Sequence, residues 1–160
     1  MTSATSPEPA DDTALFDFTV ALQPTRRVWI QAAGVALASS GLSLPLATVV
    51  LLVSRLGPGA PQSRVALEAG VNPAALVRTL DQGEAAGVLI RRHVPGDRRL
   101  REIELLPPGL ECARQIEAAL ARLRRRLLGD VDAADLAAAT RVLSLLEARA
   151  TAYVKEERQG

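Results

Sequence analysis

The sequence predicts a mainly helical α+β fold with a single β-hairpin. Hydrophobic residues make up 48% of the 160 residues but aromatic residues only 2%, so the core is built mostly from Leu, Val and Ala. This composition favours helices over an all-β sandwich. Apolar residues recur at helical spacing along most of the chain, whereas residues 88–106 are apolar at both ends around a Pro-Gly-Asp turn. The length suits one domain with a substantial core.

The predicted hairpin turns at Pro95, Gly96 and Asp97. Proline presets φ, glycine tolerates positive φ, and aspartate can bond its own backbone. The expected register pairs apolar residues at the base and opposite charges further out. It places Val88 opposite Leu105, Ile90 opposite Ile103 and Arg91 opposite Glu102.

Three arginines crowd the tip of this hairpin, namely Arg98, Arg99 and Arg101, with only Asp97 close by. Repelling cations add no stability to a soluble protein, so a polyanion is the expected partner. An ordinary solvated hairpin is the alternative. The formal net charge is only +1, so a nucleic-acid surface must come from such local clustering.

Helical spacing and capping residues predict the remaining elements. Pro24 lies inside the first run and must kink that helix or start a second one. Ser43 is the expected cap of a helix that is apolar nearly all round and should be the central buried helix. The predicted helices cover residues 13–39, 44–56, 62–69, 72–87 and 110–128, with a last helix after Asp132.

Two of these helices form a helix-turn-helix pattern. The helix over residues 62–69 ends at Gly70, and Asn72 caps the next helix with Pro73 in its first turn. The arginine hairpin follows at once, and a helix-turn-helix followed by a hairpin is a winged helix. We therefore assign residues 41–109 to a winged helix-turn-helix DNA-binding region.

The segments on either side of residues 41–109 are predicted to form a tail and a dimerisation region. Residues 1–12 are small and acidic and are predicted to be a disordered tail. Residues 13–40 and 110–155 are predicted to form a helical dimerisation region, because apolar residues of the last helix step by three and four. Packing within one chain is the alternative. The stripe consists of Leu136, Ala139, Leu143, Leu146, Ala150 and Tyr153.

The order of elements and their motifs resemble the MarR family of bacterial transcription regulators from about Gly41 to Gly109. GLSLPLATVVLLVSRLG is similar to the family's second helix, and VPGDRRLREIELLPPG is similar to its wing. Asp97 and Arg99 fall on the family's Asp-x-Arg signature. The resemblance implies a homodimer on a pseudo-palindromic operator, with two recognition helices in successive major grooves. It also implies a repressor released by a small aromatic acid or phenol.

The same resemblance implies the residues that meet double-stranded DNA. Arg99 would enter the minor groove beside Arg98, and Asp97 would orient an arginine through a forked pair. Arg78 is the leading candidate for a base or phosphate contact. The other positions open to DNA on the recognition helix are Asn72, Ala74, Ala75, Val77 and Gln82, and those open to phosphate on the preceding helix are Gln62, Ser63 and Arg64.

Three departures from the family pattern matter. Gly83 stands where the family usually has a core leucine, which costs about 1 kcal/mol of helix propensity and predicts a packing gap. Ala74, Ala75 and Val77 replace commonly polar recognition positions, so direct reading of bases should be sparse. These apolar side chains can still contact thymine methyl groups. Residues 106–108 (Leu-Pro-Pro) replace a capping threonine, so the fifth helix should start abruptly at proline.

A ligand site is suggested by Trp29 with Arg26 and Arg27, since an arginine beside an indole can hold a carboxylate and a ring. The alternative is that Trp29 is a core residue and both arginines are solvated. Cys112 is either a small buried hydrophobe, which we favour, or an oxidation sensor. His93 lacks partners at metal-ligand spacing, so no metal or cofactor is expected, and no catalytic motif is found.

Composition also predicts the compartment. A single cysteine excludes an intramolecular disulfide, and the start of the chain lacks the basic-then-apolar order of a signal peptide. The longest apolar run, residues 42–53, is interrupted and too short to span a bilayer. The expected protein is cytoplasmic, with no membrane partner. A winged helix that binds protein without specific DNA binding is the alternative to the regulator.

Overall fold

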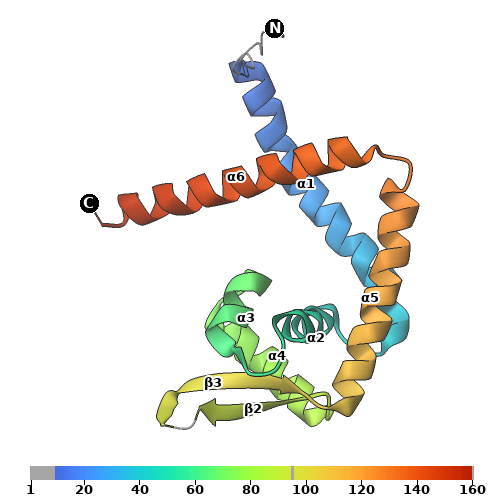
Figure 1. Cartoon of the computed structure of the whole chain (residues 1–160), viewed down its shortest axis with the longest axis vertical. Helices are drawn as coiled ribbons and strands as arrows, with labels where there is room; N and C mark the ends of the chain where they lie inside the picture. Colours follow the sequence, from blue (N-terminus) through green and yellow to red (C-terminus); the bar gives the residue numbers. More distant parts are fainter. Residues whose placement is uncertain (1–9, 95, 160) are drawn as a thin grey trace, which may run out of the picture. The chain divides into compact units, whose positions relative to one another are not determined.

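The computed structural model describes residues 10–94 and 96–159, apart from the side chains of Arg98 and Arg99. The chain divides into two units, residues 1–123 and residues 124–160. Figure 1 shows the element order, which confirms the mainly helical fold with one small sheet. The elements are α1 (Asp12–Leu37), η1 (Ala38–Ser40), α2 (Leu44–Leu56), β1 (Ala60–Pro61), α3 (Gln62–Ala69), α4 (Pro73–Ala85), β2 (Leu89–Val94), β3 (Asp97–Leu105), α5 (Pro107–Leu128) and α6 (Ala133–Glu157).

Side-chain caps set the starts of several helices where the sequence predicts them. The Ser43 hydroxyl accepts a hydrogen bond from the Leu46 amide at the start of α2. Asp132 caps α6 through the Ala134 amide at 2.7 Å. α1 begins at Asp12 and is capped by Asp11, so helical structure enters the segment that was expected to be tail. Residues 1–9 of that predicted tail lie outside the described residues.

α1 continues as one helix through Pro24, so of the two alternatives expected at this proline, a kink or a second helix near Gln23, the second helix is not formed. Proline at this position deprives the Val20 carbonyl of its helical donor. Both residues are exposed, so water can satisfy that carbonyl. The loss of this one helical hydrogen bond therefore costs little, and the helix continues beyond Pro24.

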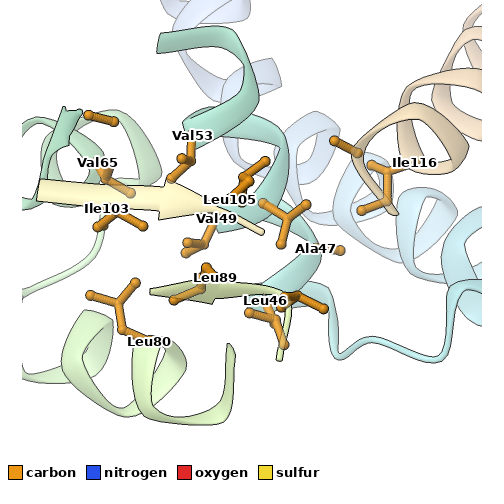
Figure 2. Close-up of a cluster of buried hydrophobic side chains, with 14 of the residues drawn as sticks. Leu46, Ala47, Val49, Val53, Val65, Leu80, Leu89, Ile103, Leu105 and Ile116 are labelled. Atoms are coloured by element: carbon orange, nitrogen blue, oxygen red, sulfur yellow. The ribbon is translucent and has the colours of Figure 1, made fainter. Parts of the chain in front are cut away.

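α2 lies at the centre of the core of residues 1–123, as its composition predicts. Five of its thirteen residues are buried, and they pack against side chains from the strands and from the neighbouring helices (Figure 2). The contributions from outside α2 include Val65, Leu76, Leu80, Leu89, Ile103, Leu105, Ile116 and Leu120. Burial of these aliphatic groups is the main driving force for folding this unit.

The sheet has the strand order β1-β3-β2, with all pairs antiparallel. Leu89 pairs with Leu105, Ile90 with Glu104 and Arg91 with Ile103, so the predicted register is wrong by one residue. The buried face decides the register, because Leu89, Ile103 and Leu105 must point into the core together. Val88, the expected first partner, instead forms the corner between α4 and β2.

The corner at Val88 also explains the start of α5. Its carbonyl accepts a hydrogen bond from the Leu106 amide at 3.0 Å. Gly109 packs so closely beneath it that an added Cβ would lie 1.9 Å from the Val88 oxygen. α5 begins at Pro107, three residues before Leu110, where the apolar pattern placed its start. Proline is tolerated in a first helical turn, as the replacement of the capping threonine by Leu-Pro-Pro had suggested. The predicted start at proline is thus confirmed.

Residues 124–160 contain the end of α5 and the whole of α6. α6 is 25 residues long, and none of its residues is buried. Among the described residues, no single helix is long and apolar enough to cross a membrane. The segments 12–40 and 44–56 pass the length and composition test only as a pair bent by 86°.

Candidate nucleic-acid interface

α3 and α4 are joined by a turn that only a few residue types allow. Gly70 ends α3 with a φ of +64°, a left-handed conformation that glycine adopts without strain. Val71 follows, and the Asn72 side-chain oxygen then accepts a hydrogen bond from the Ala75 amide at 2.8 Å. This arrangement is the helix-turn-helix predicted from the sequence. Asn72 is exposed, and its carboxamide oxygen serves the cap, so its NH2 group is the part of the side chain suited to a contact with DNA.

α4 has one buried face and one open face. Leu76, Leu80 and Gly83 are buried against the core. The open face carries every recognition-helix residue that the sequence proposed for DNA contact. These exposed residues are Asn72, Ala74, Ala75, Val77, Arg78 and Gln82.

Gly83 does not leave the packing gap that was expected. An added Cβ would lie 2.7 Å from both Cγ and Cδ2 of Leu89 and 3.0 Å from Cδ1 of Leu46. The two leucines therefore fill the space that a larger residue would take at this position. The glycine brings α4 close to α2 and β2, which a sequence comparison of single positions could not reveal.

Arg91 joins α4 to the β2–β3 hairpin, which lies beside α4 (Figure 1). Its backbone amide donates to a Glu84 carboxylate oxygen at 2.8 Å, and its guanidinium binds both Glu84 and Asp81. The Arg91 side chain is only 15% exposed. The hydrogen bonds from Arg91 lower the pKa of Glu84, and the same bonds raise the pKa of Arg91. The pair is therefore fully charged at neutral pH.

This pairing corrects the expected contact between Arg91 and Glu102. In the observed register Arg92 stands opposite Glu102, and its guanidinium donates to Glu104 at 2.6 Å. Arg91 takes the inner face of the hairpin beside Ile103, where the acidic side chains of α4 reach it. The one-residue shift in register thus exchanges the roles of two neighbouring arginines.

The hairpin turns at Gly96, which has a φ of +88°. Asp97 is exposed and opens β3, with its backbone paired to Val94. Arg98 and Arg99 belong to β3, but their side chains lie outside the described part of the structure, as does Pro95. The minor-groove role of Arg99 and the orienting role of Asp97 stay predictions.

A pocket of about 330 Å³ opens between α3, α4 and β3. Gln62 lines it half-buried, and its side-chain oxygen has no hydrogen-bond partner among the described residues. Leu100 and Arg101 reach the same pocket from β3. Arg101 was expected only as part of the arginine cluster at the hairpin tip, and Leu100 was not proposed as a site residue. Alternation along β3 is the signal that would have placed Arg101 on the inner face of the hairpin, because it shares that face with Ile103.

The other proposed phosphate contacts lie near the start of α3. Ser63 is exposed and lines the same pocket. Arg64 is exposed too, but its guanidinium pairs with Glu68 at 2.7 Å one turn along the helix. Such an exposed pair is weak, so Arg64 can exchange the carboxylate for a phosphate at little cost.

The proposed ligand residues lie on α1. Trp29 is 36% exposed and does not belong to the buried core, so its interpretation as a core residue is wrong for the single chain. Arg26 and Arg27 are exposed. No hydrogen bond or ion pair joins these three residues in the described structure, and a ligand site here stays a prediction. Cys112 is half-buried against the core, as expected of a small hydrophobe.

No protein-family profile matches the chain. Among solved structures it is similar to the transcriptional regulator PA3341, with 30% sequence identity, a TM-score of 0.77, and coverage of 84% of this chain and 98% of that one. A MarR-family transcriptional regulator from Rhodococcus sp. RHA1 has 21% identity, a TM-score of 0.73, and coverage of 83% and 94%. The regulator MOSR from M. tuberculosis, solved in complex with DNA, has 21% identity, a TM-score of 0.67, and coverage of 84% and 96%.

Proposed function

The chain belongs to the MarR family of transcriptional regulators, and we propose that it binds double-stranded DNA in the cytoplasm as a homodimeric repressor. In this proposal the α4 helices of the two copies enter successive major grooves of a pseudo-palindromic operator. The β2–β3 hairpins lie along the flanking minor grooves, where Arg99 is inserted. The protein acts by occupying DNA and not as an enzyme.

The observation that carries the proposal is the way α4 is held. Leu76 and Leu80 anchor its inner face, and Arg91 fastens its C-terminal half to the hairpin. The outer face, with Arg78 and Gln82, is open. A rigid helix with one open face that carries a guanidinium suits a major groove, which is wide enough to admit an α-helix. The DNA complex of the similar regulator MOSR supports the same use of this fold.

Exposed apolar side chains support the homodimer. α6 has no buried residue, yet Leu136, Val142, Leu143 and Leu145 are large and apolar. In proteins most of the stability of a helix comes from tertiary packing of its apolar face, and α6 has no such packing in the described structure. A second copy of the chain would cover such side chains and stabilise the helix.

Equilibrium binding to DNA tests the proposal. The full chain is titrated into a fluorescent 30-base-pair duplex drawn from the DNA upstream of its own gene, at several salt concentrations. Affinity should fall steeply between about 50 and 200 mM salt, because binding to phosphates releases counterions. Arg78→Ala should weaken binding by about 1–3 kcal/mol.

The matched control is Arg149→Ala, which removes the same charge from the exposed surface of α6. It should leave the affinity nearly unchanged if α4 is the DNA-binding surface. Absence of any complex at 50 mM salt would contradict the proposed function. Equal losses for both variants would show attraction by overall charge in place of a defined interface.

The proposed effector is a small aromatic acid or phenol held by Trp29 with Arg26 or Arg27. Trp29 is exposed, and Arg26, three residues before it on α1, shares its side of the helix, which supports this assignment. Such a ligand would release DNA only to the extent that it favours a dimer unable to bind the operator. A thermal-shift screen of aromatic carboxylates tests it, and stabilisation should be lost in Trp29→Ala. Failure of every compound would remove the support for this site.

A second candidate function is recognition of a protein by the same helix-turn-helix. Leu67, Val71 and Val77 are exposed and apolar around it, which favours this reading. Salt separates the two candidates. A protein partner held by apolar contacts would keep its affinity in moderate salt, whereas a DNA complex would not.

A further inference from the structure

The polar side chains of α4 are mostly engaged within the protein. The Thr79 hydroxyl donates to the Ala75 carbonyl at 3.2 Å. Asp81 and Glu84 both bind Arg91. Within the described structure, this leaves Arg78 and Gln82 as the polar groups of the helix that are open to an outside partner.

The rest of the open face offers methyl groups. Ala74, Ala75 and Val77 are exposed, and Val77 retains 38% of its surface as a β-branched side chain in the middle of the helix. Ala74, Val77 and Arg78 are three and four residues apart, so they share one side of α4. An apolar surface is thus continuous with the single exposed guanidinium of this helix.

We infer that α4 reads thymine through its C5-methyl groups, with Ala74, Ala75 and Val77 as the specificity-determining residues. This inference rests on the proposed function and deepens it by naming the bases that the helix selects. Alanine and valine cannot hydrogen-bond to a base edge, so a polar edge placed against them would lose its water without compensation. The thymine methyl is the one apolar group that an unmodified major groove presents.

Several features favour DNA over a protein as the occupant of this surface. Protein interfaces are centred on large side chains such as Trp, Tyr and Met, and α4 exposes none of these. The apolar surface is small and lies beside Arg78. Arg64 is also exposed on the preceding helix, and Arg101 on β3. Cations beside a few methyl groups match a phosphate backbone that flanks thymines.

The experiment removes thymine methyls one at a time. Full-length protein first selects duplexes from a random-sequence pool at low salt, and the enriched site is synthesised. Each thymine is then replaced by deoxyuridine, which loses the C5-methyl but keeps every hydrogen-bonding group. At one or more thymines in each half-site we expect an affinity loss of about three- to fivefold, the value of one buried methyl group.

A double-mutant cycle assigns the methyl to its partner. Val77→Ala is conservative at an exposed position and should fold normally. In this variant the loss caused by deoxyuridine at the contacted thymine should shrink to less than about twofold. The matched control is Val131→Ala, the same substitution at a similarly exposed valine in the turn between α5 and α6. It should keep the full deoxyuridine effect.

The outcomes are distinct. Deoxyuridine that leaves affinity unchanged at every thymine, or an enriched site without thymine, would overturn the methyl reading while leaving DNA binding intact. An unchanged deoxyuridine effect in Val77→Ala would overturn the assignment to this residue. A pool in which no duplex is retained at low salt would instead overturn the proposed function itself.

Discussion

α2 and α6 are both rich in aliphatic residues, yet they lie in opposite environments. α2 has 13 residues, five of them buried at the centre of the core. α6 has 25 residues and none buried. The same kind of side chain is therefore buried within the chain in one helix and exposed in the other. Apolar periodicity therefore identifies an apolar helix face but does not show whether that face is buried within the same chain.

The strongest contrast comes from truncating a leucine that packs beneath α2 and one on α6. Leu80 is completely buried, so Leu80→Ala should lower the free energy of unfolding by about 2–5 kcal/mol at any protein concentration. Leu143 is 46% exposed, so Leu143→Ala should cost less than about 1 kcal/mol in dilute protein. Urea denaturation followed by circular dichroism measures both.

The dependence on protein concentration distinguishes Leu80→Ala from Leu143→Ala further. If α6 packs on a second copy, the effect of Leu143→Ala should grow with protein concentration, and sedimentation should show a weaker dimer. Equal and concentration-independent losses for the two variants would contradict the contrast between the helices.

A middle-sized effect is expected at Arg91, which joins α4 to the hairpin. Arg91→Gln should lower the free energy of unfolding at pH 7 by about 1–2 kcal/mol, because it breaks charge-assisted hydrogen bonds to Glu84 and Asp81. Arg92→Gln is the matched control, since its bond to Glu104 is largely exposed and should be worth less than about 1 kcal/mol. Chemical denaturation of both variants gives the comparison.

The same variant predicts a pH dependence. Hydrogen bonds from Arg91 hold the pKa of Glu84 below its ordinary value of 4.5. The stabilisation is therefore present above the ordinary value and is lost as the pH falls through the lowered one. Between pH 7 and about pH 3 the wild-type protein should lose more stability than Arg91→Gln. Parallel pH profiles would show that Glu84 does not depend on Arg91.

The smallest effect concerns two helical glycines. An added Cβ at Gly83 would lie 2.7 Å from Leu89, so Gly83→Ala should be destabilising by about 1 kcal/mol once overpacking exceeds the gain in helix propensity. At Gly34 in α1 the nearest atom is 4.0 Å away, so Gly34→Ala should stabilise by up to about 1 kcal/mol. Melting temperatures should move in opposite directions. A shared direction would mean that Gly83 is not closely packed.

Local signals predicted most of the elements correctly. Ser43, Asn72 and Asp132 cap the helices that the sequence assigned to them. The open face of α4 was predicted as well, because a 3.6-residue period separates the buried residues from the others. These features depend on neighbours within a few positions, which the sequence displays directly.

Long-range packing explains the errors. The hairpin register was wrong by one residue because two pairings place apolar residues together, and only contact with the core selects Leu89. The expected gap at Gly83 is filled by Leu46 and Leu89, which come from different elements. The pocket that joins α3 and α4 to Leu100 and Arg101 was missed for the same reason.

The helices, their caps, the hairpin and the family resemblance could be inferred from the amino-acid sequence, apart from the shifted starts of α1 and α5, since these features depend on local order. Which arginine of the hairpin lies on its inner face depends on long-range packing. Arg91 binds Glu84 and Asp81, whereas Arg92 faces outward to Glu104. That choice follows from a strand register selected by burial of the apolar face, and burial is a property of the whole core.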